Sequence, residues 1–387
     1  MTVAGPVARH VLVPFGTRPE VVKLAPVVAA LTAAGHRVDV VDTGQHTDPA
    51  LSTELQETLG LAPTARFELP TADPATRLGS LYADAARAVG RFRPDVVLAL
   101  GDTNTVPAYA LAARGAGIPF AHLEAGLRSL NARSVEEVNR RVAAAVAALH
   151  FAPTRRAAAF LAAEGVPAQR VFVVGNPVVD TLVARGIAAV PVEQRSGVLV
   201  TAHRPTNVDD PVRLKRLVGV VRSLAEQVGP VTFPVHPRTA ARLAETGLAA
   251  ELVHPRISLT GPIGYDELLG ALASSRLAVT DSGGIQEEAA YLGVPVVVLR
   301  GSTPRWEGVE AGTTTLASLA DDSAADAVLA AAAGHTTPEA QLRAAALPCP
   351  YGDGTTGPQV AGILGAPATD ELLAITEPDF TDGSLPW

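Results

Sequence analysis

The sequence predicts an α/β protein built from two doubly wound, Rossmann-like domains that face a central cleft. Short apolar, β-branched runs alternate with longer Ala- and Leu-rich stretches, which is the pattern of parallel βαβ units. The same alternation starts again in the second half of the chain, and a length of 387 residues suits two domains of ordinary size. We place the domains at residues 1–184 and 185–365, followed by a tail at 366–387.

The first half of the chain carries strand and helix signals in alternation. The expected strands are, in order, VLVPFG, RVDVVDTG, DVVLALGD, IPFAHLEAG, LHFAPT and VFVVGNP. A helix is expected over about residues 21–34, after the first strand, and an Ala-rich helix after the third. Ser134 and Glu137 have the Ser-x-x-Glu spacing of a capping box, which predicts a helix that starts at this point.

The second half repeats this alternation after a Pro-containing, weakly periodic stretch. Its expected strands are GVLVTAHR, VTFPVHP, ISLTGP, LAVTDSGG and VPVVVLR, and helices are expected after Pro211 and from Tyr265. In doubly wound sheets, ligands bind where strands end and helices begin. Functional residues are therefore expected at these junctions.

Composition excludes several classes of protein. The chain has 31 basic and 39 acidic side chains, a net charge of −8 and no Lys/Arg-rich run, which argues against nucleic-acid or anionic-membrane partners. No segment approaches the ~18 apolar residues of a membrane span, so we expect a soluble cytoplasmic protein. The single cysteine, Cys349, rules out an intrachain disulfide, and scattered histidines predict no metal site and no cofactor.

Two glycine-containing loops at strand ends have the features of phosphate-binding sites. In FGTRPE, Gly16 permits close backbone approach, the following helix offers N–H donors, and Arg18 and Lys23 supply positive charge. In TDSGGIQEEA, the N–H groups and hydroxyl of residues 282–284 could cradle a diphosphate, while Glu288 suits the paired hydroxyls of a ribose. Either loop alone could be an ordinary turn with solvated charges. Together they predict a nucleoside diphosphate ligand.

Four ionisable residues at strand ends, or at the start of a helix, could carry acid/base chemistry: Asp102, Glu124, Glu136 and His203. Carboxylates that converge on one cleft repel one another, so one of them can hold a proton near neutral pH. Ordinary interpretations also exist. Asp102 could cap a helix, and His203 could be a hydrogen-bonded strand-end residue. Glu136 and Arg140 could form an exposed pair on one helix face.

A glycine pattern at residues 352–357, GDGTTG, matches the dinucleotide-binding motif G-x-G-x-x-G. It follows LPCPY rather than a strand, and it lies far from the start of the chain. The structural context that a dinucleotide site requires is therefore missing.

A series of short motifs runs in order between about residues 11 and 364. They are FGTRPEVVKLAP, TGQH, GDTNT, HLEAGLRS, EEVNRR, GNPVVD, TAHR, PVHPRT, DSGGIQEEAAYLGVPVVVLR and PYGDG. In these motifs the chain resembles the non-hydrolysing UDP-N-acetylglucosamine 2-epimerases, a homodimeric family with the two-domain glycosyltransferase-B fold. The resemblance implies reversible inversion at C2 of the hexosamine in a UDP-sugar. Members are thought to eliminate UDP, which leaves a 2-acetamidoglucal, and to add it back after proton delivery to the opposite face.

The resemblance also implies roles for individual residues. Asp102, Glu124 and Glu136 would surround the sugar, with Asp102 and Glu136 as the acid/base pair at C2, and His203 would assist the phosphate. The implied substrate-binding residues are Arg18, Lys23, Arg140, His236, Ser282, Gly283, Gly284 and Glu288. Among them, Lys23 would support the carboxylates and Glu288 would hold the ribose. Gln45 and His46 lie in the segment where bacterial members bind a second UDP-sugar as activator.

The sequence departs from the family pattern around the sugar and the activator. Val135 stands where members usually have Pro before the paired acids, and Thr206 replaces an acid in HRPT. The block TPRWE has Pro304 and Trp306 at two exchanged positions, and Thr47 stands in place of the usual Arg. We therefore expect nucleotide-sugar chemistry with an altered sugar preference or without the activation.

Other functions of the same fold stay open at this point. A glycosyltransferase would use the same phosphate-binding groups but pass the sugar to an acceptor, and a hydrolysing 2-epimerase would release free N-acetylmannosamine and UDP. A nucleotide-sugar binder would carry out no chemistry. The three carboxylates near C2 favour the epimerase, because a transferase usually needs fewer ionisable groups there.

Overall fold

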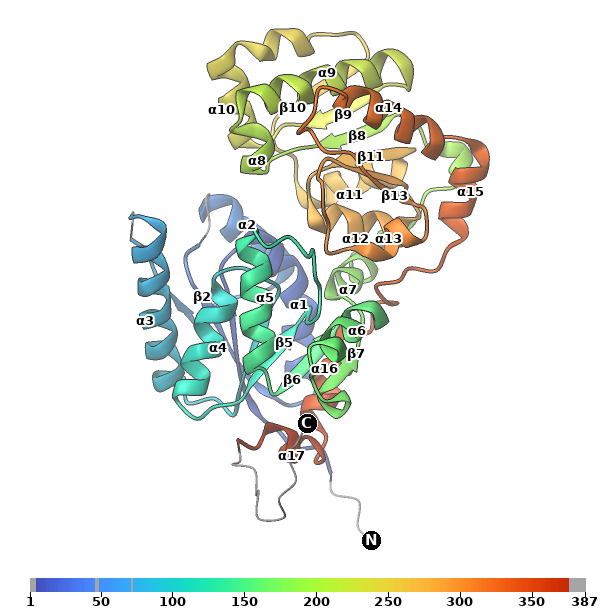
Figure 1. The fold of residues 1–387 in the computed structure, drawn as a ribbon. Coiled ribbons are helices and arrows are strands. Elements are labelled where there is room, and N and C mark those ends of the chain that lie inside the picture. The colour runs from blue at the N-terminus through green and yellow to red at the C-terminus, as the bar shows by residue number, and fades with distance from the viewer. Residues whose placement is uncertain (1–4, 46–48, 71, 376–387) are drawn as a thin grey trace. The chain divides into compact units, whose positions relative to one another are not determined.

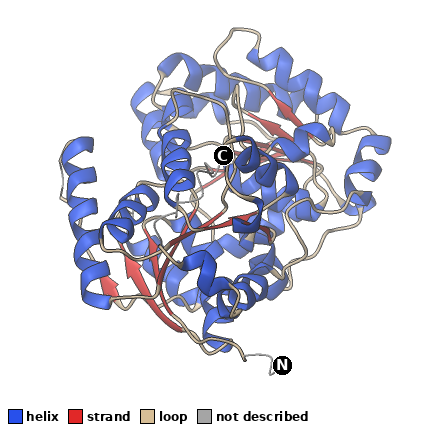
Figure 2. Ribbon diagram, turned by 60° about the horizontal axis from the view of Figure 1, so that its bottom comes forward, coloured by secondary structure: helices blue, strands red, loops and turns tan. Residues whose placement is uncertain are grey.

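The computed structural model describes residues 5–45, 49–70 and 72–375. Within these ranges the chain forms two compact units, each built on one parallel sheet with helices between successive strands (Figures 1 and 2). Unit 1 comprises residues 1–126, 132–177 and the segment from 355 onward, and unit 2 comprises residues 127–131 and 178–354. The predicted α/β class is therefore confirmed.

Unit 1 contains a seven-stranded sheet in the order β3-β2-β1-β4-β5-β6-β7. Its strands are β1 (His10–Phe15), β2 (Arg37–Asp42), β3 (Ala65–Arg66), β4 (Val96–Leu100), β5 (Phe120–Leu123), β6 (Leu149–Ala152) and β7 (Val171–Val173). Its helices are α1 (Arg18–Ala33), α2 (Pro49–Leu59), α3 (Pro74–Phe92), α4 (Thr105–Gly115), α5 (Val135–Val146), α6 (Arg155–Ala163), η1 (Ala168–Arg170), α16 (Thr356–Gly365) and α17 (Thr369–Leu373). The central strands are apolar on both faces because helices cover both faces of the sheet.

Unit 2 contains a six-stranded parallel sheet in the order β10-β9-β8-β11-β12-β13. Its strands are β8 (Val198–Thr201), β9 (Val231–Pro234), β10 (Ile257–Thr260), β11 (Leu277–Thr280), β12 (Val296–Val298) and β13 (Thr314–Leu316). Its helices are α7 (Pro177–Ala184), which begins at the boundary with unit 1, η2 (Val192–Gln194), α8 (Pro205–Val208), α9 (Pro211–Gln227), α10 (Pro237–Thr246), η3 (Leu248–Leu252), α11 (Tyr265–Ser274), α12 (Gly283–Leu292), α13 (Trp306–Glu310), α14 (Ala324–His335) and α15 (Pro338–Ala346). The helices expected after Pro211 and from Tyr265 are both present.

The C-terminal segment differs from the predicted domain boundaries. Helix α16 packs against α1, so the described residues from 355 onward lie in unit 1 rather than in the second domain. The Arg9 guanidinium donates a hydrogen bond of 2.5 Å to the carbonyl of Leu364, and the His36 ring contacts the carbonyl of Ala361 at 3.1 Å. The segment expected to be a tail from residue 366 begins with helix α17. Apolar periodicity predicts such helices but not the sheet on which they pack.

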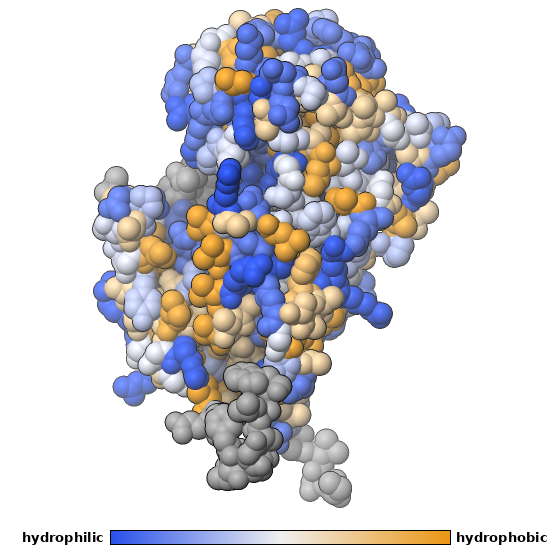
Figure 3. Space-filling view, viewed as in Figure 1, coloured by the Kyte–Doolittle hydropathy of each residue, from blue (hydrophilic) through white to orange (hydrophobic). Residues whose placement is uncertain are grey.

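Helices α3, α4 and α5 lie side by side on one face of unit 1 and leave apolar side chains exposed (Figures 1 and 3). Helix α3 buries Leu81, Ala85 and Ala88 against the sheet, at the spacing of one helix face. At the border of this buried face, Leu78 and Tyr82 are 44% and 45% exposed. Among the described residues, no helix is both long and apolar enough to cross a membrane.

Candidate active site

Predicted site residues of unit 1 follow adjacent strands of its sheet. Gln45 follows β2, Arg18 follows β1, Asp102 follows β4 and Glu124 follows β5, and these strands are neighbours in the order β2-β1-β4-β5. The strands are parallel, so their carboxyl ends, and the residues that follow them, lie at one edge of the sheet. The order reverses between β1 and β4, and such reversal points are where doubly wound sheets bind ligands. His46 lies outside the described residues.

Glu124 is a buried carboxylate with a buried cation beside it. Its Oε1 atom lies 2.5 Å from Nζ of Lys23 and accepts a hydrogen bond of 2.5 Å from the Asn176 amide. Both charged side chains are 6% exposed. Glu124 also has a φ angle of +63°, a left-handed conformation that is costly for a residue with a side chain and recurs at functional sites. Lys23 therefore supports the carboxylate.

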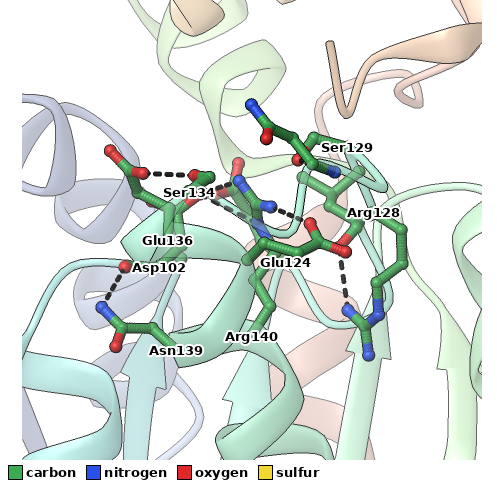
Figure 4. Close-up of polar contacts among 12 residues, drawn as sticks. Asp102, Glu124, Arg128, Ser129, Ser134, Glu136, Asn139 and Arg140 are labelled. Carbon is green, nitrogen blue, oxygen red and sulfur yellow. Dashed lines mark hydrogen bonds and ion pairs between the residues drawn. The ribbon is translucent and has the colours of Figure 1, made fainter. Parts of the chain in front are cut away.

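Arg140 lies between two carboxylates. Its Nε and Nη2 atoms donate to Oδ2 of Asp102 at 3.0 and 2.6 Å, and its Nη1 donates to Oε2 of Glu137 at 2.6 Å. The side chain of Arg140 is 4% exposed, so the alternative of an exposed pair with Glu136 is wrong. The Asn139 amide donates to the backbone carbonyl of Asp102 at 2.9 Å (Figure 4). Two successive residues of α5 therefore hold the loop after β4 and orient the Asp102 carboxylate.

Glu136 lies in the first turn of α5, at the same edge (Figure 4). The helix begins at Val135 after Ser134, as the capping-box spacing predicts. The contact differs from that prediction, because the Ser134 hydroxyl donates to Oε2 of Glu136 at 2.5 Å, and Glu137 binds Arg140 instead. Asp102, Glu124 and Glu136 therefore come from consecutive strand-to-helix junctions of one unit.

Glu20 is a buried carboxylate that is not among the site residues predicted from the sequence. It accepts hydrogen bonds from the backbone N–H groups of Gly16 and Thr17 and from the hydroxyls of Thr17 and Thr103. Burial raises the pKa of Glu20 to about 7, and these hydrogen bonds oppose the rise. A signal was present in the sequence, since Thr17 and Glu20 have the spacing of a capping box.

Three loops meet so closely around Gly16 that no side chain fits there. A Cβ atom on Gly16 would lie 2.2 Å from Nε2 of Gln45 and 2.7 Å from the hydroxyls of Thr43 and Thr105. The Gln45 amide donates to both hydroxyls. Gln45, a predicted regulatory residue, thus connects the loop after β2 with the start of α4.

The predicted phosphate site of unit 2 lies at the reversal point of the second sheet. His203 follows β8, His236 follows β9 and Ser282 follows β11, which are adjacent parallel strands. Ser282 precedes helix α12, which begins at Gly283. A Cβ atom on Gly283 would lie 2.9 Å from Nη1 of Arg305, so glycine permits the guanidinium to approach the helix start. These residues lie where phosphate-binding residues are expected. Their roles in binding stay predictions.

Gly284, also predicted to contact phosphate, is the second residue of α12. Two buried side chains near this helix, Glu287 and Arg305, are not among the site residues predicted from the sequence. Nε of Arg305 donates to Oε1 of Glu287 at 2.8 Å, and Glu287 is fully buried. Paired Glu residues in a sequence usually indicate a solvated helix face. Here Glu287 instead fixes an arginine beside the start of the helix.

Asp281 is a fully buried carboxylate that organises the loop after β8. It accepts hydrogen bonds from the backbone N–H groups of His203 and Arg204 and from the amide of Asn207. Nδ1 of His203 lies 3.5 Å from its Oδ1, and the rings of His203 and His236 are 5.4 Å apart between centroids. Desolvation lowers the pKa of His203, and the Asp281 charge opposes this. Burial thus favours the neutral ring, which carries one N–H group and can donate it to a phosphate oxygen.

Replacing Asp281 with Asn is expected to lower the pKa of His203 further. The negative charge of Asp281 stabilises the imidazolium, so its removal favours the neutral ring. An NMR titration of the His203 ring in the wild type and in Asp281→Asn measures the change. Asp322→Asn is the control, because Asp322 is an exposed carboxylate of unit 2 that pairs with Arg216. An unchanged or higher pKa in Asp281→Asn would contradict the assignment.

Glu288, the predicted ribose ligand, is 5% exposed and is oriented by a tyrosine. The hydroxyl of Tyr265, at the start of α11, donates to Oε1 of Glu288 at 2.8 Å. Burial, and then the nearby Glu288 charge, raises the pKa of Tyr265 well above its usual value. Tyr265 therefore stays protonated and keeps its donor role.

The Tyr265→Phe substitution is expected to weaken UDP binding by about tenfold, because one hydrogen bond to a charged group is worth about 1.5 kcal/mol. Isothermal titration calorimetry with UDP measures the loss. Tyr291→Phe, on the same helix as Glu288, is the matched control and should bind UDP like the wild type. Equal affinities of the two variants would show that Tyr265 does not orient the ribose ligand.

The GDGTTG segment forms the turn before α16 and the first two residues of that helix. It does not lie between a strand and a helix of a βαβ unit, so it lacks the context of a dinucleotide site. Tyr351, directly before it, is buried and donates to Glu307 at 3.3 Å. Within the described ranges, no group of three or more His, Cys, Asp or Glu side chains could hold a metal ion.

Comparison with known proteins identifies the family. The family model for UDP-N-acetylglucosamine 2-epimerase matches residues 29–365. A probable UDP-N-acetylglucosamine 2-epimerase of Ralstonia solanacearum is 36% identical over 382 residues, covering 92% of this chain and 99% of that protein. The UDP-2,3-diacetamido-2,3-dideoxy-D-glucuronate 2-epimerase of Pseudomonas aeruginosa is 32% identical, with the same coverage of both chains.

Solved structures agree with the sequence matches. The crystal structure of the Methanocaldococcus jannaschii UDP-GlcNAc 2-epimerase with UDP-GlcNAc and UDP is similar to this chain with a TM-score of 0.81. The two are 31% identical, and the match covers 92% of this chain and 99% of that one. The predicted glycosyltransferase-B class is thereby confirmed, and the chain belongs to the UDP-N-acetylglucosamine 2-epimerase family.

Proposed function

We propose that the protein inverts C2 of the hexosamine in a UDP-sugar and interconverts UDP-N-acetylglucosamine and UDP-N-acetylmannosamine. The observation that supports this best is the pairing of carboxylates with buried cations at one edge of the unit 1 sheet. Lys23 holds Glu124, and Arg140 holds Asp102. Acid/base catalysis requires such preorganised ionisable groups near the reacting carbon.

The proposed chemistry needs two acid/base groups on opposite faces of the sugar. The C2 hydrogen is not adjacent to a carbonyl, so it is removed in an elimination. A base takes the C2 proton, the C–H electron pair forms the C1=C2 bond of a 2-acetamidoglucal, and the C1–O electron pair leaves with UDP. A proton then adds to C2 from the opposite face while a phosphate oxygen re-forms the C1–O bond. We assign the two proton transfers to Asp102 and Glu136.

Unit 2 is proposed to bind the UDP group. The start of α12 offers backbone N–H donors at Gly283 and Gly284, and a helix N-terminus favours anions. The ring N–H of His203 is proposed to donate to the departing phosphate. Glu288 is proposed to accept hydrogen bonds from the ribose hydroxyls.

Incubation with UDP-N-acetylglucosamine in deuterated water, without an acceptor, tests this function. Proton NMR should show loss of the C2 hydrogen signal in the substrate and in the epimer, with no free sugar. Unchanged substrate would exclude the function for that sugar. Free N-acetylmannosamine and UDP as the only products would identify a hydrolysing enzyme, and turnover only with an added acceptor would identify a glycosyltransferase.

Besides this activity, the protein is proposed to differ from the family pattern either in its preference among UDP-hexosamines or in its activation by substrate. Trp306, one of the exchanged residues in TPRWE, donates its indole N–H to the backbone carbonyl of Arg128 at 2.9 Å. It thereby fixes Arg128, a residue of the motif HLEAGLRS that belongs to unit 2. The Pseudomonas aeruginosa relative is named for a diacetamido uronate sugar. Comparing kcat/KM for UDP-N-acetylglucosamine and for the UDP-diacetamido uronate tests the preference. Turnover of UDP-N-acetylglucosamine at a rate typical of the family, together with activation by substrate, would contradict the proposal.

The protein is proposed to form a homodimer through α3, α4 and α5. Apolar residues on these helices are 44–62% exposed: Leu78, Tyr82, Leu111, Val135 and Val138. A two-fold dimer buries the same surface on both copies. The Leu111→Arg substitution is expected to convert the dimer to a monomer in analytical ultracentrifugation, whereas Leu342→Arg, an exposed leucine of unit 2, should not. A monomeric wild type would exclude the proposal. The cytoplasmic location stays a prediction.

A further inference from the structure

A buried carboxylate at the site edge of unit 1 has no part in the chemistry proposed above. Glu20 is 2% exposed and lies in the first turn of α1, two residues after Arg18. Its Oε2 atom accepts hydrogen bonds from the N–H of Gly16 at 3.1 Å and from the N–H and hydroxyl of Thr17, both at 2.8 Å. One oxygen of Glu20 therefore fixes the loop that carries Arg18.

The other oxygen of Glu20 contacts a different loop. Oε1 accepts a hydrogen bond of 3.0 Å from the hydroxyl of Thr103, which directly follows Asp102 in the chain. The loop after β4 is held from another direction by α5, through Asn139 and Arg140. Side chains of α1 and α5 thus hold the same loop.

Backbone pairing does not reach these loops. In the described part of the sheet, β1 pairs with β4 through Val11 with Val96 and through Leu12 with Val97. Both pairs lie three or more residues before the strands end at Phe15 and Leu100. Such divergence is expected at a reversal point, where the chain leaves in opposite directions from neighbouring strands. The relative position of the two loops must therefore depend on side chains.

We propose that Glu20 is a positioning residue that sets the loop carrying Arg18 against the loop carrying Asp102. The functional consequence rests on the proposed function, which makes Arg18 a phosphate ligand and Asp102 an acid/base group at C2. The link between the loops is a separate statement about this chain. A displacement of about 1 Å at reacting groups can cost about 10² in rate, so a loss of the link is expected to lower kcat.

Three variants test the link. Glu20→Ala removes every contact, whereas Glu20→Gln keeps an oxygen for the Gly16 and Thr17 donors and turns an amide toward Thr103. Asp84→Asn is the control, because Asp84 is another buried carboxylate of unit 1, paired with Arg87 on α3. Glu20→Ala should lower kcat by about 10², while KM changes by less than about tenfold. Glu20→Gln should restore most of the rate, and Asp84→Asn should match the wild type.

Amide hydrogen exchange measures the same link without turnover. Peptides that cover residues 11–18 and 101–105 should both exchange faster in Glu20→Ala but not in Asp84→Asn. Thr103→Val should accelerate only the second peptide, because Glu20 still holds Gly16 and Thr17, and Thr103→Ser should restore slow exchange. The two Thr103 variants keep the test valid if Glu20→Ala fails to fold.

The outcomes separate the two proposals. Unchanged exchange in both peptides of a folded Glu20→Ala, and in Thr103→Val, would overturn the positioning role whether or not the enzyme is active. A loss of rate in Glu20→Gln as large as in Glu20→Ala would also overturn it, because it would assign the carboxylate a direct chemical role. Absence of C2 exchange in the wild type would instead reject the proposed function.

Discussion

Replacing Asp102 with Asn is expected to lower the rate of C2 hydrogen exchange in the UDP-sugar by a factor of about 10²–10⁴, the usual contribution of a general acid/base group. Asn has the shape of Asp and still accepts a hydrogen bond from Arg140, but it neither takes nor delivers the proton. UDP binding should change by less than about threefold, since the proposed UDP ligands lie mainly in unit 2. NMR in deuterated water measures the rate, and calorimetry measures the affinity.

The control for this variant lies on the same stretch of chain. Asp95 directly precedes β4 and accepts a hydrogen bond from the backbone N–H of His10 at 2.7 Å, at the opposite end of the strand from Asp102. Asp95→Asn should keep the wild-type rate. Loss of UDP binding in Asp102→Asn, together with lost C2 exchange, would assign Asp102 a structural role.

The sequence was most informative where a strand ends in a glycine loop. The loops at Gly16 and Gly283 follow apolar runs, and both lie at reversal points of their sheets, as expected. The return of α16 to unit 1 was not predictable in the same way. Its place in unit 1 depends on contacts across more than 300 residues, such as Arg9 with Leu364, 355 positions apart. Periodicity describes one helix at a time and contains no information on such partners.

Buried carboxylates were the residues most easily missed. Glu20, Asp281 and Glu287 are 2%, 0% and 0% exposed, yet in the sequence each looks like an ordinary helix-capping or surface charge. A buried charge requires partners, and these come from separate segments: Thr103 for Glu20, and Arg305 for Glu287. Sequence patterns therefore predict the residues expected to touch substrate but not the residues that hold them.

Local cations explain how an acidic protein can bind an acidic ligand. The net charge is −8, so the overall field opposes a UDP-sugar. At the site edge of unit 1, the buried Lys23 pairs with Glu124 and the buried Arg140 is shared by Asp102 and Glu137. In unit 2, Arg305 pairs with Glu287. These pairs reduce the repulsion between the site and the phosphates. Removing a cation from such a pair should therefore affect both stability and activity.

Replacing Lys23 with Met is expected to lower the free energy of unfolding of unit 1 by about 3–5 kcal/mol, the usual cost of leaving one partner of a buried ion pair uncompensated. Glu124 would keep its contact with Asn176 but lose its cation at 2.5 Å. Urea denaturation, followed by a probe in unit 1, measures the change. C2 exchange should fall in the same variant, because the loss of Lys23 removes a positive charge from beside Glu124 at the proposed phosphate and sugar sites.

The chain supplies its own control, because it contains only two lysines, Lys23 and Lys215. Lys215 is exposed on α9 of unit 2, so Lys215→Met removes the same charge and adds the same side chain without breaking a buried pair. It should leave stability and exchange unchanged. The double variant Lys23→Met/Glu124→Gln removes both charges of the buried pair, and part of the lost stability should return. If Lys23→Met proved as stable as Lys215→Met, the Lys23–Glu124 pair would contribute nothing to the fold, and the effect of Lys23 on activity would have to be direct.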